Sequence, residues 1–502
     1  LHKEYRRQRQ MCIRDSCYGE DIYVGYRYFE TFAKDRVRFP FGFGMSYTSF
    51  DIAASDFKLD GDKVTGSVNV KNTGSTPGRE VVQIYCSAPQ GKLGKPARVL
   101  CGFDKTRTLQ PGESQTLSFE IPLESVASYD DSGVTGHKSA WILEQGGYVF
   151  YAGADVRSAS EAYSLTLPET VVRQCKSALG PLTAFKRMVN SGGKPEFEDV
   201  PLTGEAFPHD HAKLPAEIPQ TGDRGIRLAD VVNGKNTLEE FTAQLTDYDL
   251  SCIIRGEGMG SPKVTAGTAA AFGGVSDTLT ALGIPCACFD DGPSGMRLDC
   301  GTKAFSLPNG TLLASTFDRP LMTELFTFMG LEMHTNQVDC LLGPGMNIHR
   351  HPLNGRNFEY FSEDPYLTGE MASAELAGLH STGAEGTIKH FCGNNRETRR
   401  HFLDSVISER ALREIYLRGF EKAVKKGGAK SVMTTYGQVN GVWTAGNYGL
   451  VTGILRDDWG FDGFTMTDWW ANINRRGKAP DKSDFAAMAM ACLLYTSDAA
   501  DD

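Results

Sequence analysis

The stretch Phe464-Thr-Met-Thr-Asp-Trp-Trp470 is a short apolar strand that ends on one carboxylate, Asp468, beside two large aromatic rings. It is the last of seven short apolar segments that alternate with amphipathic stretches after Leu238. Strands alternating with helical crossovers are typical of a parallel (β/α) barrel, and they fit an open doubly wound sheet less well. No Gly-rich phosphate loop follows the early strands, which disfavours a dinucleotide-binding fold. We expect the strands at Cys252–Ile254, Cys286–Phe289, Thr311–Ala314, Cys340–Leu342, Thr387–Lys389, Ser431–Thr434 and Phe464–Thr467.

Helical periodicity appears in four of the stretches between these strands. An eighth strand would fall after the last segment, so the TIM-like barrel of this chain is expected to be incomplete. The expected helices are Leu321–Gln337, Glu370–His380, Glu409–Lys426 and Tyr448–Asp457.

The region before the barrel shows a different periodicity. Apolar and polar residues alternate in short runs separated by Gly, Pro and Asn turns, which predicts an antiparallel, all-β sandwich over residues 51–166. Residues 167–237 carry weak periodicity and are predicted to be a linker with one helix near Leu182–Val189. The clearest alternating runs are Val64–Val70, Glu80–Tyr85, Ser114–Ile121 and Tyr148–Ala152.

Length and composition exclude several classes of function. A chain of 502 residues is expected to hold two or three domains, and 40% apolar with 23% charged residues describes a globular protein. The net charge of −10 without a basic run argues against nucleic acid as a partner, and no apolar run is long enough to span a membrane. The twelve cysteines form no CxxC pair and no zinc-like cluster. Several of them, such as Cys286, Cys288 and Cys340, lie in apolar runs and are predicted to be buried free thiols, which suits a cytoplasmic, reducing compartment.

The two ends of the chain do not fit the pattern between them. Cys492–Ser497 can be encoded by TGTCTCTTATACACATCT, and the reverse complement of the longer sequence yields Arg6–Ser16. That DNA resembles a transposase sequencing adapter, so residues 1–16 and 492–502 are predicted to be adapter translations and are left out of the fold. The expected natural fragment is 17–491, and an export signal or a catalytic residue outside it would not be visible, which leaves the compartment open.

Polar side chains recur where the predicted barrel strands end. In a (β/α) barrel these carboxyl ends share one face, which carries the active site. A carboxylate beside aromatic rings suits sugar cleavage, because it meets positive charge at the anomeric carbon while the rings pack on C–H faces. Cationic and polar groups nearby could grip the hydroxyls of one small polyol. The candidate residues are Asp291, Arg356, Lys389, His390, Met433, Tyr436, Asp468 and Trp469.

Each candidate also has a structural reading. Asp291 could initiate a turn before Gly-Pro, and Arg297 is expected to brace the same loop. Arg356 could pair with Glu359 or Glu363, Lys389 and His390 could cap a strand, and Met433 is more often a core residue. The joint placement of these side chains, rather than any one of them, favours a site.

Five motifs carry a family resemblance: DGPSGMR (291–297), GRNFEYFSEDP (355–365), KHFCGNN (389–395), SVMTTYGQVNG (431–441) and TMTDWW (465–470). Residues 238–491 resemble the barrel domain of glycoside hydrolase family 3, most of all its β-glucosidases. Residues 51–166 resemble that family's fibronectin-III-like domain, and 17–50 resemble the tail of its α/β-sandwich domain. This domain order is the reverse of the commonest one in the family, and it is expected to be real.

The resemblance implies roles for the candidate residues. Asp468 would be the nucleophile of a retaining, exo-acting glycosidase that releases β-D-glucose, and Trp469 would form an apolar wall toward the leaving group. Met433 would pack nearby, and no metal or organic cofactor is implied. The family's acid/base is a Glu of the sandwich domain, for which no motif is found, so the fragment is expected to hydrolyse natural glycosides poorly. The residues that would hold the sugar hydroxyls are Asp291, Arg356, Lys389, His390 and Tyr436.

Two other functions stay open. A β-xylosidase or another exo-glycosidase of the same family would share these residues. A β-N-acetylglucosaminidase fits less well, because Gly393-Asn-Asn-Arg-Glu397 stands where that branch carries a His-containing loop. A non-catalytic carbohydrate-binding relative is the alternative from another class, against which Asp468 argues. Aglycone preference, linkage preference and oligomeric state stay undetermined.

Overall fold

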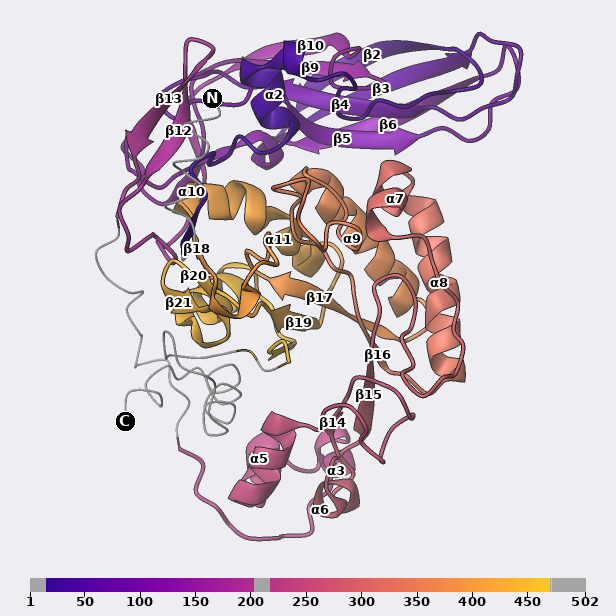
Figure 1. The fold of residues 1–502 in the computed structure, drawn as a ribbon, viewed down its shortest axis with the longest axis vertical. Coiled ribbons are helices and arrows are strands. Elements are labelled where there is room, and N and C mark those ends of the chain that lie inside the picture. Colours follow the sequence, from indigo (N-terminus) through magenta and orange to yellow (C-terminus); the bar gives the residue numbers. More distant parts are fainter. Residues whose placement is uncertain (1–14, 203–216, 470, 472–502) are drawn as a thin grey trace.

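The computed structural model describes residues 15–202, 217–469 and 471. An antiparallel β region from the N-terminal third lies across a group of helices, and parallel strands lie on the other side of those helices (Figure 1). The stretches predicted to be adapter translations lie outside the described residues, except for Asp15 and Ser16. These two residues form a short strand with Cys17, β1 (Asp15–Cys17).

Two antiparallel sheets in the N-terminal third share one core. Alternate residues of their strands point into it, among them Val68, Ile84, Phe119 and Phe150, all buried. One sheet has the order β2 (Phe50–Asp60), β3 (Lys63–Asn72) and β6 (Ser114–Pro122). The other has the order β10 (Ser160–Leu167), β9 (Gly146–Gly153), β4 (Val81–Ser87) and β5 (Val99–Lys105).

The region predicted to be a linker contains regular structure. The helix expected near Leu182–Val189 is wrong: this stretch enters the hairpin of β12 (Lys186–Ser191) and β13 (Lys194–Asp199). Gly192 and Gly193 adopt the left-handed φ values that such a tight turn needs, and the Asn190 side chain accepts the Gly193 N–H at 2.8 Å. A third sheet, β11 (Thr170–Gln174), β8 (Ala140–Leu143) and β7 (Ser128–Asp130), and helix α3 (Leu228–Val232) also use this region.

A six-stranded sheet carries the polar strand ends. Its strands run parallel from β15 to β22, whereas β14 pairs with β15 in the antiparallel direction. The strands β15, β16, β17, β19 and β22 confirm five of the seven predicted strands. The order is β14 (Ala270–Gly273), β15 (Cys286–Asp291), β16 (Cys340–Leu342), β17 (Glu385–Phe391), β19 (Ser431–Thr434) and β22 (Phe464–Met466).

Two of the predicted strands are helices. Cys252–Ile254 lies inside α5 (Asp247–Arg255), and Thr311–Ala314 lies inside α7 (Gly310–Ser315). The residues just before them explain the difference, because Thr246 accepts the Asp249 N–H and Asn309 accepts the Leu312 N–H as helix N-caps. The strand that takes part in the sheet at this end, β14, was not predicted.

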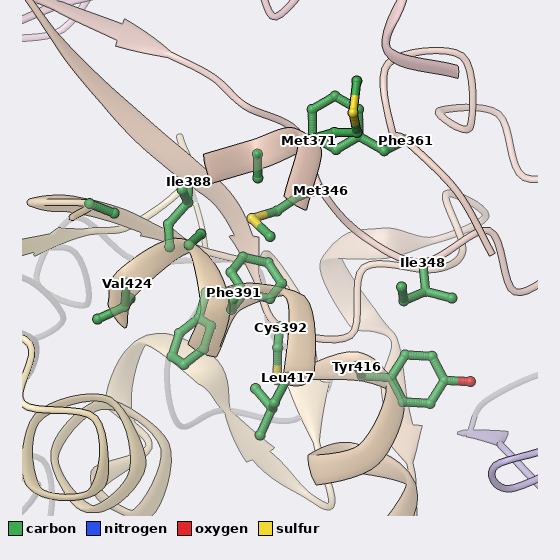
Figure 2. Close-up of a cluster of buried hydrophobic side chains, with 14 of the residues drawn as sticks. Met346, Ile348, Phe361, Met371, Ile388, Phe391, Cys392, Tyr416, Leu417 and Val424 are labelled. Atoms are coloured by element: carbon green, nitrogen blue, oxygen red, sulfur yellow. The ribbon is translucent and has the colours of Figure 1, made fainter. Parts of the chain in front are cut away.

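The predicted long helices are confirmed, and they cover one face of the sheet. Ile388 and Val432 face them and join the large buried cluster, whose centre around Met346, Phe391 and Leu417 appears in Figure 2. The helices are α8 (Arg319–Thr335), α9 (Pro365–His380), the run α10 (Glu409–Ala411), η5 (Leu412–Tyr416) and α11 (Arg418–Lys425), and η7 (Gly449–Asp458). The shorter helices are α2 (Tyr26–Phe32), η1 (Lys34–Arg36), η2 (Leu123–Val126), α4 (Leu238–Ala243), α6 (Asp277–Ala281), η4 (Arg400–Phe402) and η6 (Thr444–Gly446).

The N-terminal segment ties the β region to the loops at the strand ends. β1 pairs in parallel with β18 (Asp404–Val406), which continues through β20 (Gln438–Val439) to β21 (Val442–Trp443). The buried Tyr18 lies under the Arg350 guanidinium at 3.6 Å, and Arg350 pairs with Glu20. The Tyr26 hydroxyl donates to Asp364 at 2.8 Å and accepts the Leu100 N–H at 2.9 Å. These contacts hold the chain segment that carries Arg356 against the β region.

Candidate active site

Polar side chains from four strands gather at the carboxyl edge of the parallel sheet. Asp291 ends β15, and Lys389 and His390 lie near the end of β17. Tyr436 and Asp468 each follow the end of their strand by two residues. Parallel strands end on the same edge, so the topology brings together residues up to 177 positions apart in this chain (291 to 468).

Asp291 and Lys389 form an ion pair at this edge. Lys389 Nζ donates to Asp291 Oδ1 at 2.7 Å, and Arg297 lies 3.5 Å from Oδ2. Burial opposes ionisation of Asp291, but Lys389, Arg356 and Arg297 outweigh it and hold the pKa of this carboxyl below its usual value. Lys389 is buried whereas the Asp291 side chain is 36% exposed. An anionic oxygen therefore faces the solvent side, with a cation fixed behind it.

Asp468 is the most confined carboxyl of the group. Its Oδ1 accepts the Trp469 N–H at 2.8 Å, whereas Oδ2 is buried without a hydrogen-bond partner among the described residues. Burial raises the pKa of Asp468 above its usual value, and the nearby charges of Lys389 and Arg356 oppose that rise. One oxygen is thus oriented by the backbone, while the other accepts no hydrogen bond from the described residues.

His390 lies between Asp468 and the interior. Its Nε2 is 3.5 Å from Asp468 Oδ2, and its Nδ1 is 3.3 Å from the Tyr360 hydroxyl. Burial, together with the charges of Arg356 and Lys389, lowers the pKa of His390 well below its usual value. The ring is therefore neutral, and its approach to Asp468 is a polar contact rather than an ion pair.

Arg356 pairs with Glu359, one of the two partners considered from the sequence. Its guanidinium also lies 5.9 Å from the centre of the Tyr360 ring. The other candidate partner, Glu363, instead accepts the Tyr26 N–H at 2.8 Å. The short link between Arg356 and Glu359 within one loop turns the guanidinium toward the strand-end edge, where it contributes to the electrostatics of Asp291 and Asp468.

Tyr436 has two neighbours that sequence reasoning missed. The Arg400 guanidinium lies 4.5 Å from the centre of its ring, and the His401 ring lies 4.1 Å away. The Tyr436 hydroxyl is on the Asp468 side, and burial, followed by the charge of Asp468, raises its pKa. The basic run Arg399-Arg400-His401 was a signal in the sequence, but it lies ten residues after the nearest predicted strand, which ends at Lys389, so its place at the site was not predicted.

Met433 and Trp469 line the apolar side of the same edge. Met433 is register partner of both Lys389 and Met466, and it packs with Phe289, Met466 and partly buried Trp469. Met433 thus has the core packing that its residue type favours, while Trp469 keeps part of its surface exposed. Arg297 pairs with Asp299 at 2.8 Å, consistent with a brace for the loop after β15.

Two further properties of the described residues are relevant to function. Across residues 15–202, 217–469 and 471, His, Cys, Asp and Glu side chains form no group of three or more that could hold a metal ion. In the same residues, no helix has both the length and the apolar character needed to cross a bilayer.

Comparison with known proteins identifies the family. The model of the Glycosyl hydrolase family 3 N terminal domain matches residues 223–492, and that of the Fibronectin type III-like domain matches 80–156. A beta-glucosidase of Ruminococcus albus is 66% identical over 94% of this chain and 50% of its own length, and beta-glucosidase A of Butyrivibrio fibrisolvens is 41% identical over 90% and 59%. The chain thus spans about half to three fifths of the length of these curated relatives.

A solved structure matches both regions at once. The crystal structure of a beta-glucosidase from Paenibacillus barengoltzii superposes with a TM-score of 0.90 and 52% identity, covering 95% of this chain and 54% of the other. The family models, the sequence relatives and the superposed structure therefore agree with one another, and this chain belongs to glycosyl hydrolase family 3.

Proposed function

We propose that this chain is part of an exo-acting β-glucosidase that releases terminal β-D-glucose by a retaining mechanism. The observation that carries the proposal is the buried Asp468 carboxylate, with one unpartnered oxygen, on the same strand-end edge as Asp291, Lys389 and His390. The names of the relatives, which are beta-glucosidases at 66% and 52% identity, support the choice of glucose. We further propose that the six-stranded sheet is the described part of a (β/α) barrel.

In this mechanism Asp468 attacks the anomeric carbon and forms a glycosyl-enzyme, which water later hydrolyses. The fixed pair of Asp291 and Lys389 supplies an acceptor and spare N–H donors for neighbouring sugar hydroxyls. Arg356, His390 and Tyr436 complete this set of polar contacts, and Trp469 offers its ring to the leaving group. Met433 lies with Trp469 on the apolar side of the strand-end edge. The ion pairs and hydrogen bonds among these groups hold them in place independently of the substrate.

No residue of the chain is assigned as the proton donor. A leaving group that needs no protonation should therefore react far better than a sugar alkoxide. We expect dinitrophenyl β-glucoside to glycosylate the chain readily and cellobiose to be cleaved poorly. Cleavage of cellobiose at a rate comparable to that of the aryl glucoside would reveal a donor within this chain.

A panel of aryl glycosides tests the proposal. We expect the nitrophenyl β-glucoside to react faster than the β-xyloside, the α-glucoside and the β-N-acetylglucosaminide, and the Asp468→Asn variant to be inactive on all of them. Preferred cleavage of the xyloside would make the chain a β-xylosidase. Glucose binding by calorimetry without turnover of any aryl glycoside would indicate a non-catalytic carbohydrate-binding relative and would contradict the proposal.

A further inference from the structure

The partners of His390 decide which of its ring nitrogens carries the proton. Nδ1 lies 3.3 Å from the Tyr360 hydroxyl and Nε2 lies 3.5 Å from Asp468 Oδ2. The ring is 2% exposed and, as described above, neutral, so it carries a single N–H. Neutral imidazole has two tautomers, and only the hydrogen bonds of the surrounding groups can distinguish them.

Asn394 sets the direction of these hydrogen bonds. Its amide nitrogen lies 3.0 Å from the Tyr360 hydroxyl and 3.0 Å from Glu397 Oε1. The other oxygen of Glu397 accepts a hydrogen bond from Arg400 NH1 at 3.0 Å, so this carboxylate offers acceptors to its neighbours. If the amide were turned over, its oxygen would face this carboxylate. The nitrogen therefore faces both partners, and Asn394 donates to Tyr360.

Because Tyr360 accepts from Asn394, its own hydrogen is available for His390 Nδ1. We propose that Tyr360 is a positioning residue that holds His390 as the Nε2–H tautomer, so that His390 donates toward Asp468 Oδ2. The opposite direction would leave a lone pair on Nε2 facing a carboxylate oxygen, so that two acceptors would meet. A chain of hydrogen bonds thus runs from Arg400 and Glu397 through Asn394 and Tyr360 to His390, whose Nε2 lies 3.5 Å from Asp468 Oδ2.

The backbone of His390 is fixed as firmly as its ring. The buried Asn347 side chain accepts the His390 N–H at 2.9 Å and donates to the His390 carbonyl at 2.9 Å. With its backbone and Nδ1 both held, His390 has little freedom to turn its Nε2 away from the site.

The consequence for catalysis rests on the proposed function. The unpartnered Asp468 Oδ2 is the oxygen that a fixed N–H can stabilise while the carboxylate is anionic. When Asp468 has bonded to the sugar its charge is gone, and the same fixed N–H is available to a sugar hydroxyl. In this role His390 is a hydrogen-bond donor at every stage and does not act as a base toward the substrate.

Nitrogen NMR of the free, ¹⁵N-histidine-labelled chain at neutral pH tests the tautomer directly. The His390→Gln variant identifies the signals of His390 by their loss. We expect Nε2 to be protonated and Nδ1 to be unprotonated in the wild type. In Tyr360→Phe we expect the protonated fraction of Nδ1 to rise and kcat/KM for an aryl glucoside to fall about tenfold.

Tyr148→Phe is the matched control, because Tyr148 is also buried and donates one hydrogen bond, to the Glu144 carbonyl at 3.0 Å, within the β region. We expect it to leave the His390 signals and kcat/KM unchanged. A proton on Nδ1 in the wild type would overturn the inference, and so would His390 signals that are the same in Tyr360→Phe. The spectra need no substrate, so a chain that cleaves no glucoside would refute the proposed function without touching this result.

Discussion

Glu370 and Asp468 are both buried carboxylates, and their surroundings are opposite. Glu370 lies on α9 and binds Lys422 Nζ at 2.7 Å, Lys426 Nζ at 2.7 Å and Arg319 NH1 at 2.8 Å. Asp468 holds one backbone N–H and leaves Oδ2 without a partner. Burial disfavours the charge of both, but the lysines lower the pKa of Glu370 to about 2, whereas the pKa of Asp468 stays raised.

The difference separates a structural charge from a functional one. Glu370 joins α8, α9 and α11, and through Arg319 it reaches the β region, since Arg319 also donates to the Phe103 carbonyl at 3.2 Å. A carboxylate with three cations has no free lone pair for chemistry. Burying the Asp468 oxygen without a hydrogen bond costs free energy of folding. Such unpaired polar atoms are typical of functional sites, where a substrate supplies the missing hydrogen bond.

The largest expected effect comes from Asp468→Asn. If Asp468 is the nucleophile, kcat/KM for dinitrophenyl β-glucoside should fall at least about a thousandfold, because an amide cannot form the glycosyl-enzyme. The free energy of unfolding should stay within about 1 kcal/mol of the wild type or increase, since a poorly paired buried charge is removed. Initial rates and urea unfolding measure the two quantities. If the variant were as active as the wild type, or clearly less stable, Asp468 would have a structural role like that of Glu370.

Glu370→Gln should show the reverse pattern. Loss of the anion leaves three cations close together, so the free energy of unfolding should fall by roughly 3 kcal/mol. The value of kcat/KM, measured on folded protein, should not change. Glu120→Gln is the matched control: Glu120 pairs with Lys63 at the surface, and its loss should cost less than about 1 kcal/mol. Equal effects of the two substitutions would remove the structural role assigned to Glu370.

Arg356→Lys tests one of the residues that are proposed to bind the sugar hydroxyls. Lysine keeps the charge but loses the planar donor that binds Glu359 and lies near Tyr360. We expect KM for aryl glucosides to rise about tenfold, with a smaller change in kcat. Steady-state kinetics on the glucoside provide the check. An unchanged KM would mean that Arg356 only stabilises its own loop.

The pH dependence should separate the two carboxyls as well. The pKa of Asp468 is raised above the usual 3.8, so its anion, and with it kcat/KM, should be lost at a higher pH than an ordinary aspartate would allow. The pKa of Glu370 is lowered from 4.5 to about 2, so its stabilisation is full above 4.5 and disappears as the pH falls toward 2. On acidification we therefore expect kcat/KM to be lost at a higher pH than an aspartate of ordinary pKa would give, as a pH–rate profile measures. The difference in free energy of unfolding between the wild type and Glu370→Gln should disappear only as the pH falls from 4.5 toward 2. A profile with an ordinary aspartate pKa, or a Glu370 contribution that is unchanged at pH 2, would contradict these assignments.

The sequence was most informative for site residues that directly follow a predicted strand, because the strand end alone fixes their position. Asp291, Lys389 and Asp468 follow short apolar runs, and parallel strands necessarily end together, so their proximity could be predicted. Similar short apolar runs gave wrong strand predictions at Cys252–Ile254 and Thr311–Ala314. Both runs lie in helices that begin at the N-caps Thr246 and Asn309, and the strand pattern alone does not take N-caps into account.

The remaining site residues lie in loops between the strands, and the sequence pattern did not predict them. Tyr360 contacts His390, Asn394 contacts Tyr360, and Arg400 contacts Tyr436, only because of the paths that their loops take. Similarly, no periodicity indicates that Tyr18 and Glu20 hold Arg350 at a separation of more than 300 residues. Contacts of this kind depend on long-range packing, which residue patterns do not record.

Trapping of the glycosyl-enzyme tests the central claim most directly. The chain is incubated with dinitrophenyl 2-deoxy-2-fluoro-β-glucoside, whose leaving group needs no proton donor, and the labelled peptide is mapped by mass spectrometry. We expect a single fluoroglucosyl adduct on Asp468 and none in the Asp468→Asn variant. An adduct on another carboxylate such as Asp291 or Glu359, or turnover of the parent glucoside without any adduct, would contradict the assignment of Asp468 as nucleophile.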